Sequence, residues 1–322
     1  MVEQAQALTP ARHQTGDFSV RASWISRGSP FPGCLFTWSH LPLLTGHDPW
    51  TFLPPKCGLP KRREFSEELC VRLKLTIAYD GSPFGGWQLQ PDTDTIQGRL
   101  EGALAEIAKE PLRIHGSGRT DSGVHAAGQV AHFDPPAELT MNPVNWVAAL
   151  NTKLPATIRI LECEDVPDDF HARFSALSKT YHYELSTAPI LPPFQAGRVW
   201  HLPRQLDPAT LENCLALFRG RHDFRAFAAN RGNETAETDF HRTLSEASLA
   251  PLPQGYLLTF RGEGFLYKMV RLLTGAAVKT AQGYFRPDDL ADLLDQPPDL
   301  PRGKSPLCAP ADGLSLHKVA YT

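Results

Sequence analysis

Two hydrophobic periods alternate along the chain after residue 70, and their order restricts the fold more than any other feature. Six segments show the alternation of half-buried strands, at 72–81, 128–134, 178–186, 241–250, 255–264 and 313–321. Three segments, at 95–110, 207–220 and 265–283, repeat apolar residues at helical spacing. The elements interleave without the regular β-α-β order of a parallel sheet. This pattern predicts an α+β fold around a largely antiparallel sheet flanked by helices.

The helical segments also carry signals for where they start and which face they bury. Thr95 stands where the N-cap of the first helix is expected. The segment 265–283 has the strongest pattern, with Phe265, Met269, Leu272 and Ala276 on one face. We therefore expect a long helix that includes Phe265.

Residues 71–322 divide into two stretches with a similar mixture of strands and helices. We predict an N-terminal α+β half at 71–172 and a C-terminal α+β half at 173–322. Residues 1–70 differ, because they are rich in proline and show no sustained period, and we expect them to be largely unfolded. After Met1 the next methionine is Met141, so we hypothesise that translation starts at or near Val71 from an alternative codon. The other interpretation is a genuine tail or targeting extension.

Composition restricts the compartment. No run of about 18 apolar residues is present, so no membrane-spanning helix is expected. The first residues lack the apolar core of a secretory signal. The cysteines lie far apart and without a C-x-x-C pair, which favours isolated thiols in a reducing compartment. They are Cys34, Cys57, Cys70, Cys163, Cys214 and Cys308. We expect a cytoplasmic protein.

The net charge of −3 gives no global sign of a nucleic-acid partner. That absence excludes little, since charges are screened beyond about 8 Å and a local basic cleft can act alone.

A glycine-rich stretch, "GSGRTDSGVHA" at 116–126, concentrates the candidate chemistry. Its glycines suggest phosphate binding, but the spacing is G-x-G-x-x-D and a strand follows, so no helix N-terminus faces a phosphate. A metal site is the second alternative, since His115, Asp121, His125 and His132 are close in sequence. Their spacing matches no ligand motif. We therefore expect no metal, and assign His125 to the scaffold of the loop.

The third alternative is that Asp121 itself reacts. A loop aspartate is commonly a turn or capping residue. Here Arg119 stands two positions away, and the glycines allow a substrate to approach the backbone closely. An aspartate free in water has a pKa of about 3.9 and is an anion at neutral pH, so a cation that orients it makes a nucleophile.

Six motifs in order resemble those of the tRNA pseudouridine synthase A family. They are "YDGSPFGGWQLQ", "TIQGRLEGAL", "GSGRTDSGVHAAGQVAHF", "FHARFSALSKTYHYEL", "GRHDFRAF" and "GEGFLYKMVRLLTG". The resemblance covers essentially residues 71–322. It implies the pseudouridine synthase fold and conversion of uridine to pseudouridine at positions 38, 39 and 40 of the tRNA anticodon stem-loop, without cofactor or metal. It also implies a homodimer whose active-site clefts use both subunits.

The resemblance assigns roles to individual residues. Asp121 corresponds to the nucleophile, whose attack on the sugar or on the uracil ring stays open, and Arg119 to the arginine that helps to extrude the base. Tyr181 corresponds to the tyrosine that lies against the extruded uracil, Arg271 to the basic partner of the carboxylate, and Leu266 to an apolar residue near the uracil. Position alone equally allows core packing for Tyr181 and Leu266 and a solvated charge for Arg271.

Two points stay open at this stage. An RNA-binding protein that kept the fold and lost turnover is the alternative function, although such a protein has no use for a nucleophile. The segment before "GLSL" departs from the family, with Cys308 where threonine is common. Candidate phosphate contacts are Lys74, Arg99, Arg173 and Lys268.

Overall fold

The computed structural model describes residues 72–204, 206–232, 234–235, 237–295 and 307–322. All of these belong to one compact unit, Glu64–Thr322. The expectations for residues 1–70 lie outside the described residues. Among the described residues, no helix has the length and apolar character needed to cross a bilayer.

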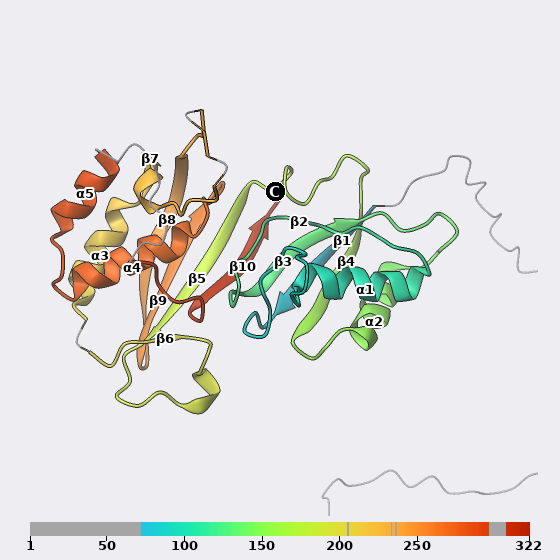
Figure 1. Cartoon of the computed structure of the whole chain (residues 1–322), viewed down its shortest axis with the longest axis horizontal. Coiled ribbons are helices and arrows are strands. Elements are labelled where there is room, and N and C mark those ends of the chain that lie inside the picture. Colours follow the sequence, from blue (N-terminus) through green and yellow to red (C-terminus); the bar gives the residue numbers. More distant parts are fainter. Residues whose placement is uncertain (1–71, 205, 233, 236, 296–306) are drawn as a thin grey trace, which may run out of the picture. The chain divides into compact units, whose positions relative to one another are not determined.

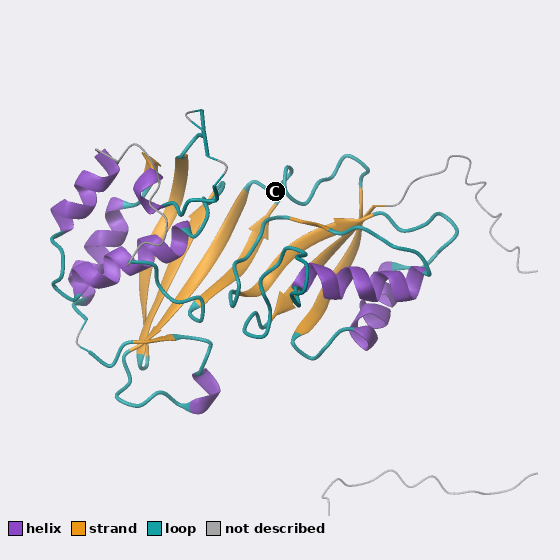
Figure 2. Ribbon diagram, viewed as in Figure 1, coloured by secondary structure: helices purple, strands orange, loops and turns teal. Residues whose placement is uncertain are grey.

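One sheet runs through the described part of the chain, and helices lie along it (Figure 1, Figure 2). Its strands are β1 Arg72–Tyr79, β2 His115–Gly116, β3 His125–Phe133, β4 Ile158–Val166, β5 Ser178–Ser186, β6 Trp200–His201, β7 Gly220–Asp223, β8 His241–Leu252, β9 Gly255–Gly262 and β10 Leu314–Ala320. The helices are α1 Ile96–Ala108, α2 Pro143–Lys153, α3 Pro208–Leu217, α4 Met269–Ala281 and α5 Pro287–Asp295.

The strands follow the order β4-β1-β3-β10-β5-β9-β8-β7, with β2 beside β3 and β6 beside β5. Neighbouring strands are antiparallel except in the pairs β10 with β3 and β5 with β6. The predicted α+β fold with a largely antiparallel sheet is therefore confirmed. The predicted boundary near residue 172 falls in the connection between β4 and β5, and the division into halves stays a prediction.

The sequence periods explain the elements that position the site. Leu73, Leu75 and Ile77 of β1 are fully buried, whereas the residues between them are partly exposed. The Thr95 side chain accepts a hydrogen bond from the Gly98 amide at 3.2 Å, so the predicted N-cap of α1 is confirmed.

The helix predicted from Phe265 begins four residues later, at Met269. Its N-cap, Lys268, has a φ of 58° in the left-handed region, which no helical residue can adopt. Phe265 and Leu266 therefore lie in the turn between β9 and α4, and the prediction that Phe265 is helical is wrong. The apolar pattern continues across the boundary because both the turn and the helix pack on the same core.

The last strand of the chain lies in the middle of the sheet. Leu316 of β10 pairs with Ala126 of β3 on one side and with Tyr181 of β5 on the other. With strands about 4.8 Å apart, Tyr181 stands roughly 10 Å across the sheet from the start of β3. β10 thereby joins the strands before residue 172 to those after it, and the glycine-rich loop lies beside this junction.

Candidate active site

The glycine-rich loop lies between β2 and β3, and hydrogen bonds hold its backbone on both sides of Arg119. The Gln129 side-chain amide donates to the Gly118 carbonyl at 3.0 Å, and the Lys179 ammonium donates to the Ser117 carbonyl at 2.8 Å. The Trp87 amide donates to the Thr120 carbonyl at 3.0 Å. This loop is therefore a fixed support for the side chains that it presents.

The segment "YDGSPFGGW" packs against that loop and supports it. The Tyr79 hydroxyl lies 2.8 Å from the Thr120 hydroxyl in a buried hydrogen bond. Gly86 has a φ of 101°, and a Cβ there would lie 2.7 Å from the Thr120 carbonyl oxygen. Likewise, a Cβ on Gly116 would meet the Trp87 ring at 2.6 Å. Glycine is required at Gly86 because two backbones approach closely there, and at Gly116 because the Trp87 ring packs directly on the backbone.

Asp121 meets Arg271 of α4, 150 positions later in the chain. The Arg271 Nη1 donates to the Asp121 Oδ2 at 3.2 Å, and both side chains are largely buried, with 15% and 19% exposed. No partner within the described residues binds the Asp121 Oδ1, which leaves one carboxylate oxygen available to a substrate. The ion pair fixes the direction of the carboxylate, so the interpretation of Arg271 as a solvated helix charge is wrong.

Arg271 is itself held by the segment before β10. Its Nε donates to the Ala309 carbonyl at 2.8 Å, and the Ala309 amide donates to the Arg271 carbonyl at 2.9 Å. Gly275 makes this approach feasible, since a Cβ there would lie 1.3 Å from the Leu307 carbonyl oxygen. The segment "LCAP" thus positions the guanidinium that orients Asp121.

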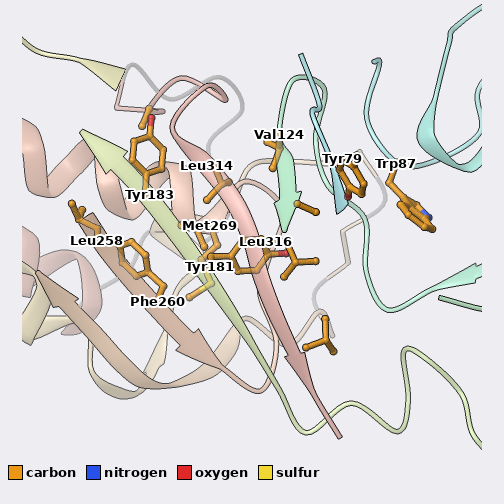
Figure 3. Close-up of a cluster of buried hydrophobic side chains, with 14 of the residues drawn as sticks. Tyr79, Trp87, Val124, Tyr181, Tyr183, Leu258, Phe260, Met269, Leu314 and Leu316 are labelled. Atoms are coloured by element: carbon orange, nitrogen blue, oxygen red, sulfur yellow. The ribbon is translucent and has the colours of Figure 1, made fainter. Parts of the chain in front are cut away.

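Tyr181 lies in a buried cluster with Met269 and Leu316 (Figure 3). Its ring packs edge-on against Phe265, with centroids 4.9 Å apart. Burial raises the pKa of its hydroxyl, and the neighbouring Tyr79 and Asp121 raise it further. The ring therefore packs in the core, as its alternation on the strand allowed.

The other two predicted residues differ in exposure. Arg119 is exposed and makes no hydrogen bond or ion pair with the described residues, so its guanidinium is available to a ligand. Leu266 is partly buried and packs against the core, and its carbonyl accepts a hydrogen bond from the Met269 amide at 3.1 Å.

A family model described as tRNA pseudouridine synthase matches residues 75–175 and 215–322, which together span most of the described chain. The chain belongs to the tRNA pseudouridine synthase family. Three relatives are each named tRNA pseudouridine synthase A. The protein of Akkermansia muciniphila is 52% identical over 78% of this chain and 95% of its own length. Those of Solidesulfovibrio magneticus and Oceanobacillus iheyensis are 44% and 41% identical, again over 78% of this chain and over 91% and 96% of their own lengths.

In this tRNA pseudouridine synthase, His125 serves the scaffold around the loop. The Gly81 amide donates to its Nδ1 at 3.1 Å, which leaves the Nε2 to donate to the Gly197 carbonyl at 2.8 Å. Both ring nitrogens are therefore occupied by the scaffold. Among the described residues, no group of three or more histidine, cysteine, aspartate or glutamate side chains is arranged to hold a metal ion.

The three described cysteines of the synthase are free thiols, at Cys163, Cys214 and Cys308. The other three lie outside the described residues. Cys308 is half-buried, and its thiol lies 3.7 Å from the Ala309 carbonyl. The departure at Cys308 therefore leaves the contact between Ala309 and Arg271 in place.

The candidate phosphate contacts fall into two kinds. Lys74 is paired with Glu164, and Arg99 with Asp94 at 2.6 Å. Arg173 and Lys268 instead lie over the rings of Phe174 and Tyr267, at 5.6 and 5.2 Å from the centroids.

Three residues of this site were not identified from sequence: Tyr79, Gln129 and Lys179. The first two hold the loop through hydrogen bonds that no local pattern reveals. Lys179 had a signal, because it lies two positions before Tyr181 on a strand and so projects from the same face.

Proposed function

We propose that this chain converts uridine to pseudouridine at positions 38, 39 and 40 of the tRNA anticodon stem-loop, with Asp121 as the nucleophile. The ion pair between Asp121 and Arg271 carries the proposal, because it orients a carboxylate and leaves its second oxygen available. Family membership supports the reaction class. The choice of stem-loop positions rests on the motif resemblance alone.

The reaction begins when an Asp121 oxygen forms a bond to the substrate, either at the ribose anomeric carbon or on the uracil ring. The bond between the base nitrogen and the ribose breaks, and the base turns within the site. A bond then forms between uracil C5 and the ribose, and Asp121 is released. The hydrogen at C5 leaves to water as a proton, and the base nitrogen that was bound to the ribose takes up a proton from water. Atoms balance without an oxidant, a reductant or a second substrate, which is consistent with the expectation of no cofactor.

The remaining groups assist binding and base extrusion. Extruding a base costs a few kcal/mol, whereas stacking on an aromatic ring returns about 1–3 kcal/mol per base. Tyr181 is suited to that role, and the exposed guanidinium of Arg119 is suited to fill the space that the base leaves. Leu266 supplies apolar surface near the same turn. We further propose that the protein acts in the cytoplasm, on the basis of its isolated cysteines and its composition, and that it is a homodimer, as the resemblance implies.

Release of tritium from tRNA labelled at uracil C5 tests this function, because C5 loses its hydrogen only when the new bond forms. We expect release with the wild-type protein. Binding of tRNA without release would instead support the alternative, an RNA-binding protein that has lost turnover. Substrates that lack uridine at 38, 39 or 40 in turn test the positions. Release from each of them that equals the release from the unchanged tRNA would contradict the site assignment.

A further inference from the structure

Lys179 lies against the loop that carries Arg119 and Asp121. Its ammonium donates to the Ser117 carbonyl at 2.8 Å, and a Cβ added to Gly118 would lie 3.3 Å from the same nitrogen. Lys179 shares its strand face with Tyr181, two positions along β5, which corresponds to a separation of about 7 Å. Lys179 and the ring proposed to stack on the uracil are therefore close enough to contact the same nucleotide.

The charge of Lys179 has no balancing carboxylate in the described part of the chain. An ammonium has three donors, and the Ser117 carbonyl accepts from one of them. Burial, and to a smaller extent the charge of Arg173, together lower the pKa of Lys179 to about 8. Placing a cation in a partly buried site beside a second cation is unfavourable in the free protein. The arrangement becomes favourable when an anion binds there.

Arg173 lies on a hydrogen-bonded turn beside β2, since the ring of His171 on that turn lies 5.9 Å from the ring of His115. The Ser175 amide donates to the His171 carbonyl at 2.9 Å, and the Ser175 hydroxyl accepts from the His171 amide at 2.9 Å. The His171 Nδ1 accepts from the Arg173 amide at 3.1 Å, which fixes the backbone of that residue. The guanidinium makes no ion pair with any described carboxylate and rests over Phe174, whose side chain is 76% exposed. A cation that has no carboxylate partner and lies beside an exposed aromatic ring is typical of surfaces that bind single-stranded RNA.

We propose that Lys179 and Arg173 together bind a backbone phosphate of the RNA, next to the uridine that reacts at Asp121. The inference rests on the proposed function. Two cations without a carboxylate partner among the described residues lie on β5 and on the turn before it, both beside the stretch from His115 to Ser117 that leads into the catalytic loop. Phosphate is the anion that a tRNA substrate brings there. The phosphate also draws the Lys179 ammonium and the loop toward the same nucleotide.

The salt dependence of tRNA binding separates this role from a purely structural one. Each phosphate contact contributes about one unit to the slope of the logarithm of the binding constant against the logarithm of the salt concentration. Affinity for a tRNA transcript is measured at several salt concentrations for Lys179→Gln, Arg173→Gln and the double variant. The matched controls are Lys153→Gln and Arg286→Gln, which remove ion-paired cations from α2 and from the start of α5.

We expect Lys179→Gln to flatten the salt-dependence slope by about one unit and Lys179→Arg to keep the wild-type slope. Both control variants should also keep the wild-type slope. The double variant should lose less affinity than the sum of the single losses, since both cations serve one phosphate. An unchanged slope in Lys179→Gln, with turnover lost, would overturn the inference and leave Lys179 as a structural support of the loop. Tritium release from the wild type is measured separately: its absence, with the slope change present, would remove the proposed function and keep the phosphate site.

Discussion

Arg271 and Asp121 form a largely buried ion pair across 150 positions of sequence, and the Ala309 carbonyl holds the arginine in place. Each end of the pair comes from a different stretch of the chain. The loop after β2 supplies the carboxylate, and α4 supplies the guanidinium. The active site therefore forms only when β10 and the segment before it have packed against the loop after β2 and against α4.

Arg271→Lys removes the planar group that contacts Asp121 and Ala309 at once. Hydrogen bonds to charged groups contribute about 1.5–3 kcal/mol, so kcat should fall by roughly 10- to 150-fold. Because the contact acts on the nucleophile, we expect little change in the affinity for tRNA. Single-turnover tritium release and a separate binding measurement check the two quantities. A variant with normal kcat would show that the ion pair does not orient Asp121.

Gly275→Ala tests the close approach that positions Arg271. The new Cβ would lie 1.3 Å from the Leu307 carbonyl oxygen, so the segment 307–309 must move away from α4. We expect a loss of stability of about 1–3 kcal/mol, as for other overpacked sites, together with reduced turnover. Denaturant unfolding and tritium release measure both effects.

Gly102→Ala is the matched control for that substitution. Gly102 lies within α1, and nothing lies within 4 Å of a Cβ added there. In a helix interior, alanine is more stabilising than glycine by about 0.5–1 kcal/mol. This variant should therefore be slightly more stable than the wild type and equally active. Equal behaviour of the two variants would contradict the role given to Gly275.

Tyr181→Leu keeps an apolar side chain in the buried cluster but removes the aromatic face. Tyr181→Phe keeps that face. If the ring stacks on the extruded uracil, the extrusion equilibrium should differ between the two variants by about 1–3 kcal/mol, or roughly 5- to 150-fold. A fluorescent base analogue at the target position reports extrusion directly. Equal extrusion in both variants would assign Tyr181 to core packing alone.

The lowered pKa of Lys179 predicts how stability changes with pH. Between about 8 and the usual value of 10.5, the unfolded chain keeps the proton that folded Lys179 has lost. The unfolded state then binds more protons, so the free energy of unfolding rises with pH through this window. Relative to Lys179→Met, the wild-type protein should gain stability from about pH 8 to 10.5 in the absence of RNA. Parallel curves of unfolding free energy against pH for the two proteins would contradict the lowered pKa of Lys179.

Sequence periods predicted the strands and helices that have one regularly buried face. β1 alternates buried and partly exposed side chains along its whole length, β5 alternates from Tyr181 to Leu185, and α1 carries its own cap. Two helices were not predicted, because α2 buries only Trp146 and Leu150 and α5 only Leu290 and Leu294. In α2 so few buried residues leave a weak periodic signal, whereas α5 has a clear apolar face but only nine residues, so tertiary packing decides whether these helices form.

The geometry of the site could not be derived from local patterns. Asp121 and Arg119 stood out because glycines surround them, but the pairing of Asp121 with Arg271 depends on contacts between distant segments. The insertion of β10 between β3 and β5 is equally non-local, since neighbouring strands in sequence are the ones a pattern connects most readily. Arg271, Tyr181 and Leu266 were therefore predicted from family resemblance, and their positions became clear in the fold.

Release of tritium from tRNA labelled at uracil C5, compared between the wild type and Asp121→Ala, tests the central claim most directly. In the proposed mechanism the carboxylate reacts with the substrate and contributes little to holding the RNA, so we predict that release is abolished while tRNA affinity stays within about tenfold. Release by Asp121→Ala at a rate near that of the wild type would remove Asp121 from the mechanism and contradict the account.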